Sequence, residues 1–438
     1  MSGIFSKLGS LAGPAAVIAA GSMGAGSVAT LILAGAWFRY ELLWVIPLTL
    51  PLFVAAVDSS SRIGSVNRGQ GMLSIVRQHI HPGVAWLLLA VNVPVHMLVG
   101  MSQLSVMTSA FLSLLGLEPQ TVDGVREGIP GIEIVTSIVL AALVAWLVLS
   151  RGYQRMQTVM TGLMVAMFVC FLLIALRSFS ELGDILQGFV PGVPDDLPAP
   201  GHNTVRISTA TIIAMVGSTI APGSLLTIPY LSSDATRGDP ELGRNLRRFI
   251  VNLGIIFGAY SIFILVAGGF ALYALTNHAE IETVGEAGQV LTLALPHSLG
   301  FLGPLLFTMG LFIAAMTTLV ICVQLVIYLS LDMFRKPWSF TRDNPLFGRL
   351  VMAVTLLVGV LAPVWDFPAM LKVVLMMGAN VFVVPLVIFT LIYLLNRRAV
   401  MGEHTAGAPR NLLLGVCLIM AVALAVNQFP NYLSMVLK

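Results

Sequence analysis

A glycine-rich interruption lies in the middle of the first long apolar run of this chain, at Gly21-Ser22-Met23-Gly24-Ala25-Gly26-Ser27. Each glycine costs about 1 kcal/mol of helix propensity relative to alanine, so the glycines predict that the backbone leaves helical geometry here. In a bilayer this is tolerated only where the freed N–H and C=O groups are buried in protein or face a wet cavity. The run therefore predicts a broken membrane helix.

A second interruption of the same kind occurs in a later apolar run, at Gly217-Ser218-Thr219-Ile220-Ala221-Pro222-Gly223-Ser224. The proline strengthens the prediction of a break, because it removes a backbone donor from the helix interior. Broken helices at matching places in two halves of a membrane chain are typical of secondary transporters, which bind their substrate between the breaks. We therefore expect a central binding site at this point.

Composition places the chain among integral membrane proteins. Of its 438 residues, 57% are hydrophobic and 10% are charged, and the mean hydropathy is +0.94. A membrane-spanning helix needs about 20 apolar residues. We expect an all-α polytopic fold of eleven spans in one transmembrane domain, residues 1–438. The predicted spans are 12–38, 42–62, 83–115, 132–150, 156–177, 206–231, 249–275, 299–332, 346–365, 369–395 and 411–430.

The order of the spans predicts an internal repeat. The two broken spans are the first and the sixth, and they enter the membrane from opposite sides. This is the arrangement of an inverted 5+5 repeat, with a first repeat at about 12–177, a second at about 206–395 and an additional helix at about 411–430. Of the 23 basic residues, 17 fall in segments on the N-terminal side of the membrane, so the positive-inside rule predicts a cytoplasmic N-terminus and an outside C-terminus. We expect a bacterial inner (plasma) membrane protein.

Motifs of other protein classes are absent from the sequence. It contains no GxxxxGK[ST], HExxH, GxSxG or CxxC motif, so neither enzyme activity nor a cofactor is expected. Cys170, Cys322 and Cys417 all lie in apolar runs, which argues against a disulfide framework or a cysteine-based metal site. No basic stripe indicates nucleic-acid binding. The expected partners are the lipid bilayer and a small-molecule or ion substrate.

The side chains at the two interruptions are small and neutral. Unwound backbone offers N–H groups to an anion and carbonyls to a cation, while the hydroxyls donate or accept. Close helix packing is the alternative explanation for small residues, but it does not require paired breaks with a proline. The predicted substrate-binding residues are Ser22, Gly24, Ala25, Gly26, Ser27, Ser218, Thr219, Ala221, Pro222, Gly223 and Ser224.

A few further polar residues fall inside predicted spans. His96 and Gln103 lie about two turns apart in the third span, and a histidine at mid-membrane is a candidate proton relay. The alternative for His96 is a buried imidazole bonded to a backbone carbonyl. Thr317, Thr318 and Asn380 are candidates either for a polar lining or for interhelical hydrogen bonds. A proton is thus a candidate coupling ion, with facilitated diffusion as the alternative.

Several stretches together resemble a known family. The first span carries Gly13-Pro14, Gly26, Ala29-Thr30, Ala34-Gly35-Ala36, Phe38, Tyr40 and Leu42-Leu43-Trp44-Val45. Later spans carry Arg62-Ile63-Gly64, Gly217 with Thr219, Pro222 and Leu225, Gly310-Leu311 with Ala314, and Pro385-Leu386 with Met401-Gly402. These stretches resemble the Nramp divalent-metal transporters over most of the chain. The resemblance implies a LeuT-like fold of eleven helices that works by alternating access.

The metal-binding residues of that family do not carry over. Where the family has Asp-Pro-Gly-Asn, this chain has Gly24-Ala25-Gly26-Ser27, and where the family has Met-Pro-His it has Ala221-Pro222-Gly223. A second family His falls at Ile228, and a family Glu used in proton movement falls at Gln103. A magnesium-carrying branch also alters the Met position but keeps the Asp. In every one of these replacements the residue in this chain is neutral.

The replacements lead to a functional prediction. Because a dehydrated divalent cation needs anionic ligands, we expect an Nramp-like secondary transporter whose neutral, widened site takes a small solute instead of a dehydrated transition metal. The alternative is a divalent-cation carrier, of the Mn²⁺ or Mg²⁺ type, that takes a largely hydrated ion through carbonyls and hydroxyls. A third possibility, a non-transporting membrane sensor or subunit, lacks a visible signalling domain in the sequence.

Overall fold

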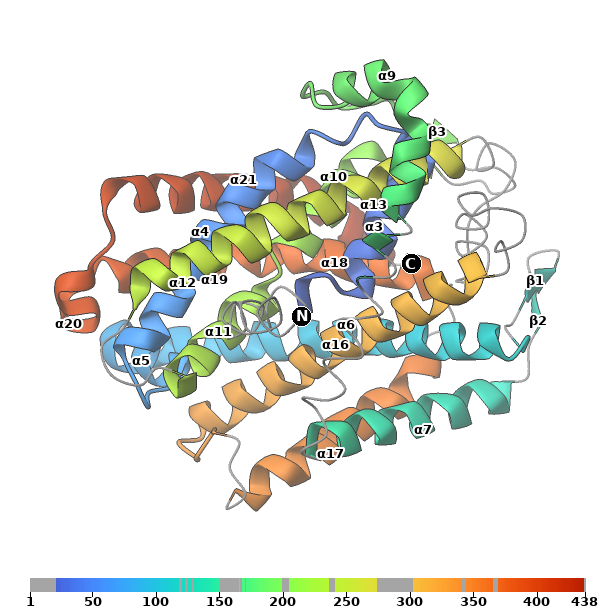
Figure 1. The fold of residues 1–438 in the computed structure, drawn as a ribbon. Helices are drawn as coiled ribbons and strands as arrows, with labels where there is room; N and C mark the ends of the chain where they lie inside the picture. The colour runs from blue at the N-terminus through green and yellow to red at the C-terminus, as the bar shows by residue number, and fades with distance from the viewer. Residues whose placement is uncertain are drawn as a thin grey trace, which may run out of the picture.

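The computed structural model describes residues 21–117, 120–122, 125–127, 130–149, 165, 168–169, 171–198, 205–235, 241–273, 302–339, 344–364 and 369–436. These ranges form a bundle of helices with two short β-hairpins (Figure 1). The first group of helical segments is α3 (Ala25–Phe38), α4 (Val45–Val66), α5 (Met72–His79), α6 (Pro82–Leu114), α7 (Pro130–Leu149), η1 (Ser178–Glu181) and α9 (Leu182–Gln187). The hairpins pair β1 (Gln120–Val122) with β2 (Val125–Glu127), and β3 (Leu197–Pro198) with β4 (Val205–Arg206).

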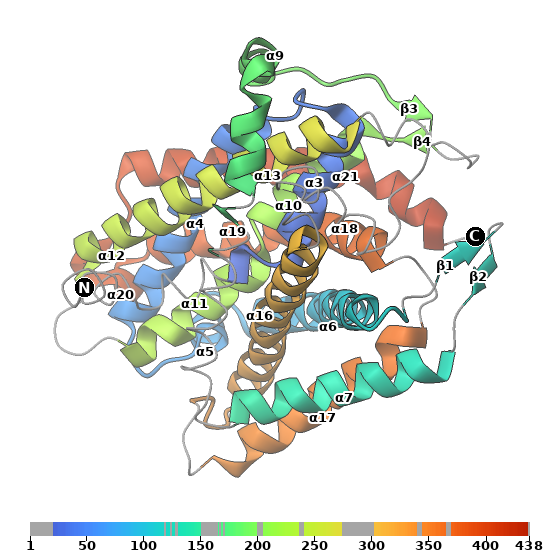
Figure 2. The same ribbon diagram turned by 45° about the vertical axis from the view of Figure 1, so that its right-hand side comes forward.

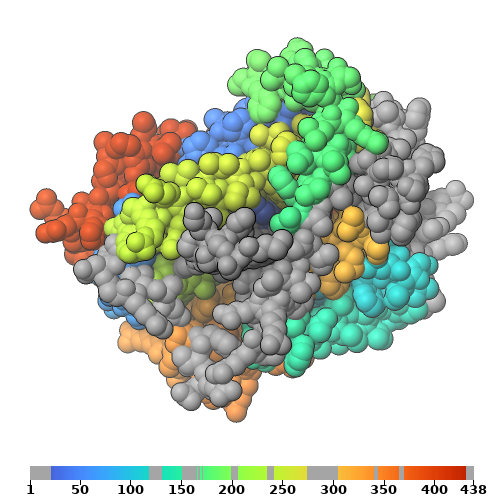
Figure 3. Space-filling view, in the orientation of Figure 1, coloured from blue at the N-terminus to red at the C-terminus, as the bar shows by residue number. Residues whose placement is uncertain are grey.

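The C-terminal part of the chain continues the bundle. Its segments are α10 (Ser208–Thr219), α11 (Pro222–Ala235), α12 (Leu242–Phe249), η2 (Ile250–Ile256), α13 (Phe257–Ala271), α16 (Leu302–Met333), α17 (Pro345–Leu361), η4 (Ala362–Val364), α18 (Ala369–Ala379), η5 (Asn380–Phe382), α19 (Val384–Leu395), α20 (Arg398–Met401), η6 (Gly402–His404) and α21 (Ala408–Val436). The π-helical η2 joins α12 to α13 in one continuous rod. Figure 3 shows this rod on the face turned to the viewer, below the α9 segment.

The bundle has two ends that matter for the site. We call the end that carries α9 and the β3–β4 hairpin the α9 end, and the end that carries α5 and α20 the α5 end (Figure 1). α6 and α16 pack against each other along their length, and α7 packs beside α17, as both views show (Figure 2). α6 has 33 residues, so at 1.5 Å per residue it is about 50 Å long, more than the thickness of a hydrocarbon core.

Both predicted helix breaks are present. Gly24, directly before α3, has extended backbone (φ −73°, ψ 172°). α10 ends at Thr219, Ile220 leaves helical geometry (φ −92°, ψ 61°), and α11 begins at Pro222. α3 packs against α10, α13 and α18, so the first break lies close to the second. The two breaks therefore meet inside the bundle, as the sequence predicts.

The described helices also fit a membrane. Seven of them are long and apolar enough to cross a bilayer, or eight if one bent pair is counted as a single span. Large apolar side chains point outward from α7 and α21, including Val139, Trp146, Ile419 and Val426. The predicted total of eleven spans and the repeat boundaries stay predictions, because most of span 156–177 and parts of other spans lie outside the described residues.

One predicted span has a different shape from the expectation. The span at 369–395 is not a single helix: Ala369–Phe382 and Val384–Leu395 meet at an angle of 41°. Pro385 lies just after the bend, where its ring cannot continue the preceding helix without a clash. Asn380, in the short 3₁₀ segment η5 at the bend, is brought towards the other two breaks.

Candidate functional site

A small cavity lies where the breaks meet, and its volume is about 40 Å³. By the same measure a single water molecule needs about 10–15 Å³, so this cavity has room for about three waters. Most of its lining residues are buried, and none of those described is a carboxylate. The lining consists of Gly21, Ser22, Gly24, Gly26, Ser27, His96, Val99, Ser218, Ala221, Gly223, Ser224, Thr318, Ile321, Cys322, Met377 and Asn380.

Serine hydroxyls connect the two breaks across this cavity. Ser27 Oγ donates to the carbonyl of Ser22 at 2.7 Å and to the carbonyl of Ser218, in the other break, at 3.3 Å. The hydroxyls of Ser22 and Ser224 face each other at 3.5 Å. Carbonyls freed by the breaks are thus partly satisfied by neutral hydroxyls, and each carbonyl keeps a second lone pair.

The space expected from the glycines is filled by side chains of surrounding helices. An ideal Cβ placed on Gly26 would lie 2.6 Å from Met377 Sδ, and one placed on Gly223 would lie 2.6 Å from His96 Nε2. A Cβ on Gly24 would overlap the hydroxyl of Thr318. The prediction of a neutral lining agrees with the structure, but the prediction of a widened site does not. The glycines admit neighbouring side chains and leave little open volume.

His96 is bonded to a backbone carbonyl, which is one of the two alternatives drawn from the sequence, while its role as a proton relay stays a prediction. Its Nδ1 lies 2.8 Å from the carbonyl oxygen of Asn92, one turn earlier in α6. Since a carbonyl only accepts, Nδ1 carries the hydrogen, and in the neutral ring Nε2 keeps its lone pair. That nitrogen faces Gly223 at the second break. The imidazole is bonded to a backbone carbonyl and also presents an acceptor to the cavity.

Asn380 reaches the cavity from the bend after α18. Its Nδ2 donates to the carbonyl of Gly217 at 3.3 Å and lies 3.8 Å from Met377 Sδ. Its Oδ1 is buried and has no partner among the described residues. A buried acceptor without a partner costs about 1–3 kcal/mol, so a cation or water that reached this oxygen would recover that cost.

Five predicted site residues do not line the cavity. Ala25 and Pro222 are buried in the flanking helices, and Thr219 Oγ1 bonds the carbonyl of Met215 at 2.9 Å. Thr317 Oγ1 bonds the carbonyl of Ala314 at 2.8 Å within α16. Gln103 is fully buried further along α6, and neither polar atom of its amide has a partner among the described residues.

The sequence reasoning missed several lining residues. Met377, Cys322, Ile321 and Val99 were not selected, because in an apolar span each resembles ordinary core packing. A signal for Met377 was nevertheless present: Gly378-Ala379-Asn380, followed by Pro385, interrupts an apolar span much as the first two breaks do. In the part of the chain that the structure describes, no group of three or more His, Cys, Asp or Glu residues could hold a metal ion.

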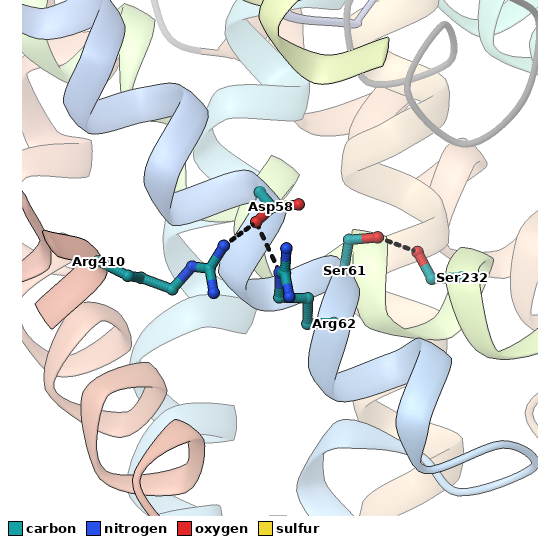
Figure 4. Close-up of polar contacts among 5 residues, drawn as sticks. All are labelled: Asp58, Ser61, Arg62, Ser232 and Arg410. Carbon is teal, nitrogen blue, oxygen red and sulfur yellow. Dashed lines mark hydrogen bonds and ion pairs between the residues drawn. The ribbon is translucent and has the colours of Figure 1, made fainter. Parts of the chain in front are cut away.

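Ionic and hydrogen-bonded contacts tie the helices together at the α5 end. Asp58, 1% exposed, accepts from Arg62 Nε at 2.8 Å and from Arg410 Nη2 of α21 at 2.7 Å (Figure 4). On the next turn, the hydroxyls of Ser61 and Ser232 lie 2.9 Å apart and join α4 to α11. These contacts hold α4 against both α21 and the second half of the broken span.

Asp332 makes a second set of contacts at the same end. Its Oδ2 accepts from the backbone N–H groups of Leu73 at 2.8 Å and Ser74 at 3.2 Å, at the N-terminus of α5. The hydroxyl of Tyr230 in α11 donates to the same oxygen at 2.8 Å. One carboxylate, 2% exposed, thereby joins α16, α5 and α11.

The α9 end is closed by a different set of charges. Arg39, just past α3, lies 3.3 Å from Glu181 and 3.0 Å from Asp184. Tyr40 donates to Glu181, and burial together with this hydrogen bond raises the pKa of the Tyr40 hydroxyl. Trp44 Nε1 donates to the carbonyl of Gly192 at 2.8 Å. The cavity thus lies between two groups of hydrogen bonds and ion pairs, one at each end of the bundle.

Comparison with known proteins agrees with this arrangement. A sequence profile of the family described as "Natural resistance-associated macrophage protein-like" matches residues 15–429. The chain belongs to the Nramp family. Its relatives include a divalent metal cation transporter MntH of Klebsiella pneumoniae, 23% identical over 87% of this chain and 85% of the relative.

Other Nramp relatives match over shorter lengths. MntH of Burkholderia ambifaria is 26% identical over 64% of this chain and 62% of the relative. MntH of Pediococcus pentosaceus is 26% identical over 54% of this chain. The chain spans 47% of the length of the Pediococcus relative.

Solved structures share the fold. A manganese transporter of Eremococcus coleocola has a TM-score of 0.71 at 13% identity, covering 97% of this chain and 87% of its own. MhsT in complex with L-phenylalanine gives 0.65 at 13% identity, covering 95% and 97%. MHP1, a nucleobase-cation-symport-1 family transporter, gives 0.56 at 14% identity, covering 94% and 92%. This Nramp-family chain therefore has the LeuT fold that its resemblance to the family implies.

Proposed function

We propose that this protein is a secondary transporter that moves a metal cation across the membrane by alternating access, and that it binds the cation in the cavity between the two helix breaks. The observation that carries the proposal is that both breaks, in a chain of the Nramp family, meet at one small cavity deep in the bundle, whose mainly apolar lining carries a few polar acceptors. Its acceptors are hydroxyls, backbone carbonyls, an amide oxygen and an imidazole nitrogen, which suit a cation.

The size of the cavity supports an ion over an organic solute. A volume of about 40 Å³ accommodates a metal ion with part of its hydration shell. A solute with several heavy atoms would have to displace Met377, His96 or Thr318 from the glycines that they face. We therefore propose the divalent-cation alternative in place of the small solute, with the relatives named as divalent metal cation transporters as further support.

The absence of charge from the described lining residues determines the hydration and the affinity that we expect for the bound ion. With no carboxylate among the described lining residues, the ion keeps its full charge, and the desolvation cost of stripping all its water is not recovered. A partly hydrated ion reduces that cost. We expect weaker binding than at a site with a carboxylate ligand, and transport that saturates only at high metal concentration.

Uptake into liposomes tests the proposal. Purified full-length protein is reconstituted, and entry of Mn²⁺, Co²⁺ and Mg²⁺ is followed with a metal-sensitive dye in the lumen, beside uptake of labelled amino acids and small organic acids. We expect saturable entry of at least one metal and none of the organic solutes. The small-solute interpretation would be restored if metal entered no faster than into empty liposomes while an organic solute was taken up saturably.

A further inference from the structure

Four glycines of the two breaks line the cavity. All of them except Gly21 are faced by an atom that can bind a metal ion, and each such atom belongs to a helix outside the breaks. His96 Nε2 from α6 faces Gly223, and Met377 Sδ from α18 faces Gly26, each 2.6 Å from an ideal Cβ. Thr318 Oγ1 from α16 faces Gly24. Donor atoms thus reach the cavity from the surrounding helices, at the positions where the breaks carry no side chain.

The imidazole of His96 is oriented as a ligand. The ring is 3% exposed, and Nδ1–H donates to the carbonyl of Asn92 at 2.8 Å. Histidines that bind metals usually donate their other ring N–H to a carbonyl or carboxylate, which fixes both the ring and the tautomer. No group of the described chain donates to Nε2, so its lone pair remains available.

Asn380 supplies an independent observation of an unfilled acceptor. The residue is 2% exposed, its Nδ2 is directed at the carbonyl of Gly217 and at Met377 Sδ, and its Oδ1 has no partner among the described residues. The residue lines the same cavity as His96 and Met377. A cation bound there would satisfy an oxygen that is otherwise buried without a partner.

We propose that His96 Nε2, Met377 Sδ and Asn380 Oδ1 are ligands of the transported ion, and that the site selects a borderline transition-metal ion of the Co²⁺ to Zn²⁺ kind. Imidazole nitrogen and thioether sulfur favour such ions, whereas Mg²⁺ and Mn²⁺ favour oxygen ligands. One residual water, hydrogen-bonded by Ser22 or Ser224, completes a shell of low coordination number. This assignment rests on the proposed function and names the donors of the same site.

The visible absorption of Co²⁺ bound to the full-length protein in nanodiscs tests the ligands directly. A nitrogen- and sulfur-containing site of low coordination number gives intense d–d bands, whereas hydrated octahedral Co²⁺ gives weak ones. We expect intense bands in the unmodified protein. His96→Asn, which keeps a donor near Nδ1 and removes Nε2, and Met377→Leu should each weaken Co²⁺ binding at least about tenfold and change the bands.

Matched controls separate ligand loss from general damage. His81→Asn makes the same replacement at the exposed N-cap of α6, where asparagine also caps well. Met376→Leu makes the same replacement one residue before Met377, outside the cavity lining. Both controls should bind Co²⁺ with unchanged affinity and spectrum. Thermal unfolding identifies any variant that fails to fold. Even then, the spectrum of the unmodified protein tests whether nitrogen and sulfur ligands bind Co²⁺.

The outcomes distinguish this assignment from the proposed function. Weak octahedral bands, or unchanged bands and affinity in both His96→Asn and Met377→Leu, would overturn the ligand assignment. If Co²⁺ nevertheless entered liposomes, the metal-transport function would stand with oxygen ligands only. If no metal entered liposomes, the proposed function itself would fail.

Discussion

At the scale of single residues, a glycine near a helix break is constrained by the atom that faces it. The position of a Cβ on Gly217 is occupied by the backbone carbonyl of Met377, which cannot rotate away. The position of a Cβ on Gly26 is 2.6 Å from the sulfur of the same methionine, near the end of a flexible side chain. Gly217 should therefore tolerate an added side chain less well than Gly26, although both belong to predicted breaks.

This contrast gives a prediction for stability. Gly217→Ala should lower the free energy of unfolding by about 1–3 kcal/mol, because α10 and α18 must move apart. Gly26→Ala should unfold close to the temperature of the unmodified protein and should instead weaken metal binding by displacing Met377. Thermal unfolding in detergent, followed by metal titration, measures both effects. Equal destabilisation by the two changes would contradict the assigned contacts.

Much of the site was predictable from residue types. Glycine, proline and hydroxyl residues marked both breaks, because their effects on the backbone are local. His96, Thr318 and Asn380 were identifiable as polar groups in apolar spans. Met377 and Cys322 were not, since an apolar side chain that lines a cavity has the same sequence signature as one in the core. The filling of the glycine positions depends on packing between distant helices, which the sequence does not display.

At the scale of elements, α5 is held by one buried carboxylate. Asp332 accepts from the first backbone amides of α5 and from Tyr230 of α11, so it joins a short helix to the second half of a broken span. α5 has 8 residues and would be marginal without this contact. Asp332 is therefore a candidate latch for the α5 end.

Hydrogen exchange tests this latch. Asp332→Asn keeps the shape of the side chain but removes its charge, and charge-assisted hydrogen bonds are worth about 1.5–3 kcal/mol. Amides of Leu73 and Ser74 should exchange at least about tenfold faster. Asp196→Asn is the matched control, because Asp196 accepts from the backbone N–H of Ser208 at 2.8 Å at the start of α10. Faster exchange at Ser208 alone is expected there, and unchanged protection of Leu73 in Asp332→Asn would refute the latch.

The contact between α4 and α21 gives a third prediction. Asp58→Asn leaves the guanidinium groups of Arg62 and Arg410 without their shared counter-charge. Removing one partner of a buried ion pair costs about 3–5 kcal/mol, so the melting temperature should fall clearly. Glu241→Gln is the control, since its pair with Arg244 is exposed and such pairs contribute about 0–1 kcal/mol. Equal melting of both variants would show that Asp58 does not hold α21 in place.

The sequence predicted that the elements are helices more completely than it predicted where each helix begins and ends. The helical class and both breaks were predicted from apolar length and from glycine and proline. The bend between α18 and α19 was missed because Asn380 and Pro385 were treated as parts of one span. α5 lies between the second and third predicted spans and was not predicted, because an amphipathic helix of 8 residues is too short to stand out in an apolar chain.

At the scale of the whole molecule, the cavity lies between two sets of contacts that join different helices. Asp58 and Asp332 act at the α5 end, and Arg39 with Glu181 acts at the α9 end. Alternating access requires that one set opens while the other holds. The central claim is that the helix breaks between these two ends form the path of the metal ion.

Metal uptake by a pair of glycine variants tests that claim most directly. Gly223→Leu would drive a side chain into His96 at the second break, whereas Gly415→Leu adds the same side chain in α21, where nothing lies within 4 Å of the Cβ. Both proteins are reconstituted at equal density, and their saturable metal uptake is compared with that of the unmodified chain. We predict that Gly223→Leu abolishes uptake while still folding, and that Gly415→Leu retains it. Normal uptake by Gly223→Leu would mean that the ion takes another path.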